Sequence, residues 1–199
     1  SACICRLDFS NGSADSCSRL TAMNQCTESL KAAVDQAMPF AEELLNELRE
    51  KSRDGAGVSR ETYGTGEQIG HDVLKQAAAR VGLETEVDFA GNLYMTLRGT
   101  DPSLPGWITG SHLDSVPCGG NYDGAAGVVA SITAISALRA KGIVPPRNIT
   151  VIGVRAEEAS SWYAGSHNGH IGSRAALGTL PAEELVSAVN SRSGITLKE

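Results

Sequence analysis

The feature that most constrains the fold is a pair of short apolar runs with a helical segment between them. Residues 107–111 (WITGS) form the first run, and residues 149–156 (ITVIGVRA) form the second. Between them, residues 127–142 carry small and apolar side chains over the length of a helix, and Gly142 is placed to end it. This order predicts a strand–helix–strand unit with a right-handed crossover. The continuous second run favours the centre of a mainly parallel sheet.

The segments before this unit predict further helices and strands. Apolar side chains recur at helical spacing over residues 27–51, where Pro39 predicts either one kinked helix or two helices. A second amphipathic helix is expected over residues 67–81, ended by Gly82. Residues 84–99 alternate around a Gly-Asn pair, which predicts a hairpin or two successive strands. The fold class expected from these elements is α/β, with a mainly parallel sheet and flanking helices.

The first 26 residues differ from the rest of the chain and are expected to form an irregular Cys-rich segment. They are rich in Ser and Asn and hold four of the five cysteines: Cys3, Cys5, Cys17 and Cys26. A zinc or disulfide cluster is the alternative interpretation of this segment. However, no Cys-x-x-Cys spacing is present and the number of cysteines is odd, which favours reduced thiols and a cytoplasmic location.

Charge and hydropathy exclude several classes of partner. The 199 residues carry a net charge of −6 and no basic cluster, so nucleic acid is not an expected partner. No apolar run reaches the length of a membrane span, and we expect no membrane association. The first ten residues, SACICRLDFS, are too polar and too short for a signal peptide, and the missing initiator Met indicates processing or trimming. A small-molecule substrate is the expected partner.

Potential ligands of a metal ion follow both strands of the central unit. His112, Asp114 and Asp123 lie in the glycine-rich stretch GSHLDSVPCGGNYDGAAGVV, directly after the first strand. Glu157 and Glu158 follow the second strand. Ligands of open α/β sheets bind outside the carboxyl ends of the strands, so these five side chains should converge at one edge.

A histidine with several carboxylates is the ligand set of Zn²⁺ or Mn²⁺ in hydrolytic enzymes. A carboxylate can bridge the two ions of a binuclear site. Asp114 lies two residues after His112, so its carboxylate can reach the second imidazole nitrogen and fix the tautomer. The adjacent acids Glu157 and Glu158 would supply one ligand and one free general base. Each motif alone is common on protein surfaces, and only their combination at successive strand ends indicates a site.

These motifs resemble those of the hydantoinase/carbamoylase-type amidases. The resemblance is carried by GSHLDSVPCGGNYDGAAGVVA and RAEEASSWYAGS…IGSRAALGTL, and upstream by GVSRETYG and VDFAGNLYMTLRG. The family includes N-carbamoyl-L-amino-acid hydrolase, β-ureidopropionase and allantoate amidohydrolase, and is part of the wider group of two-metal aminoacylases and carboxypeptidases. The resemblance implies that residues 27–199 are the N-terminal part of an exopeptidase-like catalytic domain. This part would end near the start of a lid and dimerisation insertion.

The resemblance also implies a role for each candidate residue. His112 would bind one metal ion, Asp123 would bridge both ions, and Glu158 would bind the second. Glu157 would be the general base, and Asp114 would orient His112. The implied cofactors are two divalent ions, Zn²⁺ or Mn²⁺, with Co²⁺ or Ni²⁺ as alternatives. The implied reaction is attack of hydroxide on an amide or ureido carbonyl, which converts an N-carbamoyl amino acid into the amino acid, CO₂ and ammonia.

The sequence departs from the family pattern in ways that leave alternatives open. The HIEQG-type motif and a late metal-binding histidine are absent, so the C-terminal half is expected to be missing, and the full-length protein is expected to form a homodimer. His167 and His170 could substitute for a missing ligand, although Asn168 and Gly169 favour a solvated turn. An aminoacylase or dipeptidase with the same metal site is an alternative function. A non-catalytic fragment that binds a metal or a partner is another.

Overall fold

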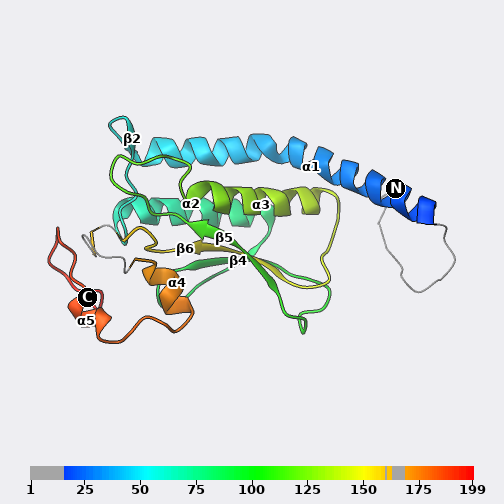
Figure 1. Cartoon of the computed structure of the whole chain (residues 1–199). Coiled ribbons are helices and arrows are strands. Elements are labelled where there is room, and N and C mark those ends of the chain that lie inside the picture. Colours follow the sequence, from blue (N-terminus) through cyan, green and yellow to red (C-terminus); the bar gives the residue numbers. More distant parts are fainter. Residues whose placement is uncertain (1–15, 160, 163–168) are drawn as a thin grey trace.

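A four-stranded sheet forms the centre of the molecule, as seen in the computed structural model (Figure 1). The structure describes residues 16–159, 161–162 and 169–199. In the order in which they lie side by side, the strands are β3 (Glu84–Val87), β4 (Leu93–Leu97), β6 (Ile149–Val154) and β5 (Trp107–His112). Helices α1 (Ser16–Lys51), α2 (Thr65–Val81) and α3 (Ala125–Ala140) stack on one face of this sheet. The α/β class with flanking helices is confirmed.

The prediction of a mainly parallel sheet was wrong. Only the pair β5–β6 is parallel, whereas β3–β4 and β4–β6 are antiparallel. The physical reason is the type of connection: β5 and β6 are joined through α3, and a crossover helix allows a parallel pair. Strands β3 and β4 are joined by a short turn, which permits only an antiparallel hairpin. This hairpin was one of the two arrangements expected for residues 84–99.

Helix α1 is longer and more continuous than expected. It begins at Ser16 and includes Pro39, so the described part of the predicted irregular segment is helical and the two-helix alternative was wrong. Pro39 cannot donate a main-chain hydrogen bond, and packing of α1 on both sides of Pro39 offsets the loss of this bond. Ala33 precedes Pro39 and Leu44 follows it, and both side chains are buried. Cys26 is a half-buried free thiol, whereas Cys3 and Cys5 lie outside the described residues.

The other predicted helices form close to their expected bounds. Gly82 ends α2 in the left-handed conformation with φ 75°, as its position after the last apolar residue predicts. Helices α2 and α3 pack against the sheet, and α1 packs on these two helices. Their apolar side chains form one core, represented by Leu48, Leu74, Ile132 and Val151. Full burial of each such side chain contributes about 1.5–3 kcal/mol. The core therefore fixes the ends of β5 and β6 relative to α2 and α3.

Short elements complete the described chain. A two-stranded ribbon of β1 (Arg53–Asp54) and β2 (Gly57–Val58) connects α1 to α2. Two short helices, α4 (Ile171–Ala176) and α5 (Glu184–Ser187), follow β6. Among the residues described, no helix combines the length and the apolar character needed to cross a membrane.

Candidate metal centre

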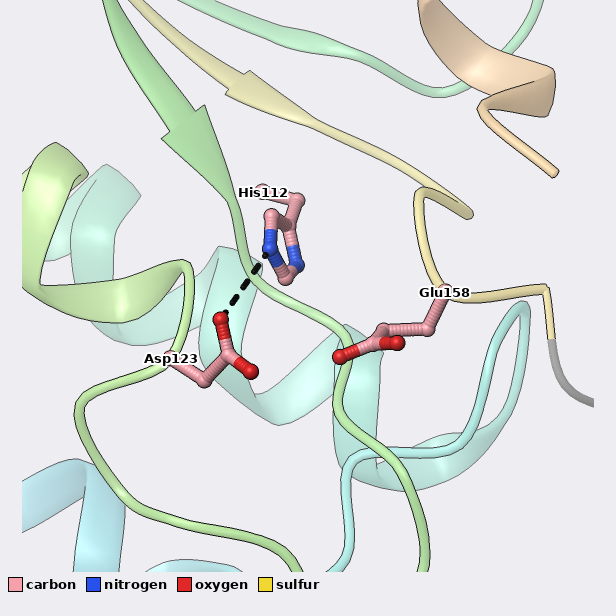
Figure 2. Close-up of side chains that lie close together, drawn as sticks. All are labelled: His112, Asp123 and Glu158. Atoms are coloured by element: carbon pink, nitrogen blue, oxygen red, sulfur yellow. Dashed lines mark ion pairs between the residues drawn. The ribbon is translucent and has the colours of Figure 1, made fainter.

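Three side chains from separate segments converge at the carboxyl ends of β5 and β6. His112 is the last residue of β5, Asp123 lies just before α3, and Glu158 follows β6. One potential ligand atom from each lies within 4.8 Å of the other two. Figure 2 shows the three side chains facing a common space. The predicted convergence of the two loops is therefore observed, because β5 and β6 are parallel neighbours whose carboxyl ends coincide.

The two ring nitrogens of His112 face different partners. Nε2 points toward the cluster and lies 3.7 Å from Asp123 Oδ1 and 3.7 Å from Glu157 Oε2. Nδ1 lies 3.3 Å from Asp114 Oδ1 and 3.1 Å from the main-chain oxygen of Asp114. Burial disfavours the charged ring, but Asp114 and Glu157 outweigh it and raise the pKa of His112. This arrangement leaves Nε2 available for a metal ion and supports the predicted orienting position of Asp114.

Asp114 is completely buried and fully hydrogen-bonded. It accepts hydrogen bonds from Thr62 Oγ1 at 2.8 Å and from the N–H groups of Glu157 at 3.1 Å and Glu158 at 3.0 Å. Burial alone would raise its pKa, but the hydrogen bonds from His112, Thr62 and Glu157 lower it below the usual value. Asp114 therefore remains ionised and joins the two loops that carry the candidate ligands.

The electrostatics of Glu158 fit a cation site. Burial, followed by the negative charges of Asp123 and Glu157, raises the pKa of Glu158. Carboxylates gathered in this way repel one another unless a cation neutralises them. One imidazole nitrogen and two carboxylates also form a donor set suited to Zn²⁺ or Mn²⁺. The residues present therefore fit a divalent metal ion.

Glu157 lies beside the three potential ligands and is not one of them. Its Oε1 atom lies 2.9 Å from His170 Nδ1, and its Oε2 atom faces His112 Nε2. His170 is 60% exposed at its side chain and, among the residues that the structure describes, is not part of the cluster of metal ligands. His167 lies outside the described residues. The idea that His170 replaces a missing ligand therefore finds no support, and its observed partner is the proposed base.

A glycine is required where the chain enters α3. Gly124 has φ 64°, and a Cβ atom built on it would lie 2.5 Å from His112 Nδ1. Any side chain at this position would collide with the histidine or displace it. The close approach of Gly124 lets the preceding Asp123 turn toward the cluster.

Sequence reasoning did not single out several residues that support the site. Thr62 lies in the segment GVSRETYG, and Asn92 lies in VDFAGNLYMTLRG. Both segments resemble the family, so the resemblance pointed to these stretches of the chain. The spacing of their residues, however, predicted no contact of Thr62 or Asn92 with the site. Their partners are 52 and 63 residues away, at Asp114 and at the main-chain N–H of Arg155.

The chain is similar to known amidohydrolases. Residues 92–191 match the family model described as Peptidase family M28. The chain is 34% identical over 162 residues to N-carbamoyl-L-amino-acid amidohydrolase of Paenarthrobacter aurescens, a match over 80% of this chain and 38% of that protein. It is 36% identical over 120 residues to allantoate amidohydrolase of Bacillus subtilis, which covers 59% of this chain and 29% of that protein.

A solved structure shows the same relationship. The hydantoinase/carbamoylase family amidase from Burkholderia ambifaria superimposes with a TM-score of 0.67 at 30% identity, over 79% of this chain and 38% of that one. These matches confirm the resemblance to the hydantoinase/carbamoylase-type amidases. The chain spans well under half the length of these relatives.

Proposed function

Since the chain belongs to Peptidase family M28, whose model matches about half of it, we propose that it is the N-terminal part of a metal-dependent amidohydrolase. Its reaction is hydrolysis of a linear amide or ureido C–N bond, with N-carbamoyl amino acids as the preferred substrate class. The observation that carries the proposal is the convergence of His112, Asp123 and Glu158, with Glu157 beside them. The amidohydrolases to which the chain is similar support the choice of bond.

The residues of the candidate site have two kinds of role, which are to hold cations and to transfer a proton. His112, Asp123 and Glu158 would hold the divalent ions, and the Asp123 carboxylate would be shared between them. Bound divalent ions would polarise the substrate carbonyl and lower the pKa of the attacking water. Glu157 takes a proton from that water as it attacks the carbonyl carbon, and returns the proton to the leaving nitrogen as the C–N bond breaks. Asp114 keeps Nε2 of His112 directed at the cluster.

Three ligands are few for two cations, so we propose that the remainder of the full-length protein supplies the others. Zinc ions in catalytic sites usually have three protein ligands each. We also propose that the full-length protein is a cytoplasmic homodimer. The same shortage of ligands favours one second candidate, in which this chain alone binds a metal ion without catalysing a reaction.

Metal content tests the proposal first. The chain is purified without chelators, incubated with Zn²⁺ or Mn²⁺, desalted and examined by elemental analysis. We expect the wild-type chain to retain at least one ion and Asp123→Asn to retain clearly less metal. Asp72 is an exposed acid on α2, and Asp72→Asn should leave the metal content unchanged. A wild-type chain that retains no ion under saturating metal would overturn the proposed site.

An activity assay then tests catalysis and the substrate class. Release of ammonia from N-carbamoyl amino acids is compared with release of the acid from N-acyl amino acids, for the metal-loaded chain and the full-length protein. Ammonia release supports the ureido substrate class, and cleavage of only the acyl compounds supports an aminoacylase. A metal-loaded full-length protein that cleaves neither class would contradict amidohydrolase function.

A further inference from the structure

The loop that carries Glu157 and Glu158 is held by three buried side chains, and the proposed mechanism does not use two of them, Glu67 and Asn92. Each of the four main-chain N–H groups of residues 155–158 donates to a buried side-chain oxygen. The first bonds to Asn92 Oδ1 at 2.9 Å and the second to Glu67 Oε1 at 2.8 Å. The last two bond to the carboxylate of Asp114. Four consecutive amides are thus fixed by three residues distant in sequence.

The carbonyl groups of the same loop are also hydrogen-bonded. The oxygens of residues 155, 156 and 157 accept hydrogen bonds from the N–H groups of residues 172, 171 and 170, at 3.1, 2.9 and 2.9 Å. Every main-chain donor and acceptor of residues 155–157 therefore has a protein partner. A loop bonded in this way has little freedom to change conformation.

The backbone of this loop adopts a conformation that it would not keep without such support. Ala156 has φ 55° and Ala159 has φ 45°, so the two alanines that flank the acidic pair are both in the left-handed region. Such a conformation costs of order 1–3 kcal/mol for each residue that is not glycine, and it persists only where the surroundings impose it. The hydrogen bonds to Glu67 and Asn92 are part of those surroundings.

Glu67 and Asn92 are themselves rigidly placed. Both side chains are completely buried. The second oxygen of Glu67 accepts from the N–H of Tyr63 at 2.6 Å and from Arg155 Nη1 at 3.3 Å. Asn92 Nδ2 donates to Asp88 Oδ2 at 2.8 Å and to the main-chain oxygen of Gly172 at 3.0 Å. Each residue is therefore a fixed acceptor to which the loop docks.

We propose that Glu67 and Asn92 are positioning residues that hold the loop ready for metal binding and proton transfer. They do so before any cation binds, because their hydrogen bonds are made to the main chain and not to the ligand atoms. Prior ordering of Glu158 removes the entropy cost of ordering it when the metal binds. This proposal rests on the proposed function, because it concerns the ligand and the base of that site.

Metal affinity measures the positioning effect. Affinity for Zn²⁺ is determined by competition with a chromophoric chelator for wild type, Glu67→Gln and Asn92→Ala. In Glu67→Gln, an amide NH₂ replaces one acceptor oxygen and faces a main-chain donor. We expect affinity about 10–100-fold weaker in both variants, as for other partners that orient metal ligands. The matched control on α2, Asp72→Asn, should leave the affinity unchanged.

Hydrogen exchange separates positioning from a general loss of structure. In the metal-free wild type, the amides of residues 155–158 should exchange slowly. In Glu67→Gln they should exchange faster while the amides of β6 keep their protection. Variants that remain folded and bind Zn²⁺ as tightly as wild type would overturn the proposal. If the variants do not fold, rapid exchange of residues 155–158 in the metal-free wild type overturns it, and slow exchange supports it.

The two proposals fail in different ways. A wild-type chain that binds no metal refutes the metal centre, whereas the exchange measurement on the metal-free chain still tests the positioning of the loop. A wild type that binds metal, together with variants of unchanged affinity, refutes only the positioning.

Discussion

At the scale of single residues, two adjacent carboxylates have different surroundings. Glu158 faces His112 and Asp123, whereas Glu157 contacts His170 and the edge of the His112 ring. Their main-chain amides bond to the same carboxylate, that of Asp114. The difference between them therefore arises from side-chain direction, which is the basis for giving one the role of ligand and the other the role of base.

Isosteric substitutions distinguish the two acids. Glu158→Gln should lower metal content because it removes the charge of a proposed ligand. Glu157→Gln should retain the metal but lower kcat by about 10²–10⁴-fold, because it removes the proposed general base. Metal analysis and turnover of an N-carbamoyl amino acid by the full-length protein measure both effects. Loss of metal from Glu157→Gln together with full retention in Glu158→Gln would reverse the assignment.

The exposed histidine beside the base gives a second prediction. His170→Ala should leave metal content unchanged, because the His170 ring contacts Glu157 and not the three potential ligands. Elemental analysis of the variant beside wild type measures this. A fall in bound metal would restore His170 as a substitute ligand.

At the scale of elements, the turn into α3 is the most demanding local structure. Gly124 combines a positive φ of 64° with direct contact on the His112 ring. Gly124→Ala should destabilise the fold by about 1–3 kcal/mol and weaken metal binding, because the backbone strain and the collision both act on the site. In the described part of the chain, nothing lies within 4 Å of a Cβ atom built on Gly120, so Gly120→Ala is a matched control. Urea unfolding of both variants tests this, and equal stabilities would contradict it.

Helix α1 gives an element-scale prediction away from the site. Pro39 is exposed and lies inside the helix, where it leaves the carbonyl of Asp35 without its helical donor. Pro39→Ala should restore this hydrogen bond and raise the free energy of unfolding by about 3 kcal/mol or less. Gln36→Ala, also exposed on α1, should change it by only a few tenths of a kcal/mol. A Pro39→Ala chain less stable than wild type would show that the helix needs the proline.

At the scale of the whole molecule, pH acts on stability through a buried histidine. His71 is 4% exposed, and its Nε2 atom has no hydrogen-bond partner among the residues that the structure describes. Burial, helped by the charge of Arg155, lowers the pKa of His71 from 6.5 to about 3. The folded chain therefore keeps this ring neutral at pH values where the unfolded chain protonates it.

The sign of the pH effect follows from this difference. The stabilising contribution of His71 is complete above pH 6.5 and is lost as the pH falls toward 3. Within this interval, the contribution of His71 to the free energy of unfolding falls by up to about 1.4 kcal/mol for each pH unit. His71→Leu should have a flatter dependence of the free energy of unfolding on pH between 6.5 and 4 than wild type, measured by urea titration at each pH. Parallel pH curves would contradict the prediction.

The amino-acid sequence by itself determined the type of most elements and the convergence of the candidate ligands. Periodicity, glycine positions and the order strand–loop–helix–strand are local properties, and they were enough to bring His112, Asp123 and Glu158 to one edge. Only the tertiary structure decided the direction of β4 against β6, the continuity of α1 through Pro39 and the hydrogen-bond partners of Thr62, Glu67 and Asn92. These depend on which distant segments meet and on which buried donors need acceptors. The acceptor of the Ala156 amide is the carboxylate of Glu67, 89 residues earlier, and no local pattern encodes that contact.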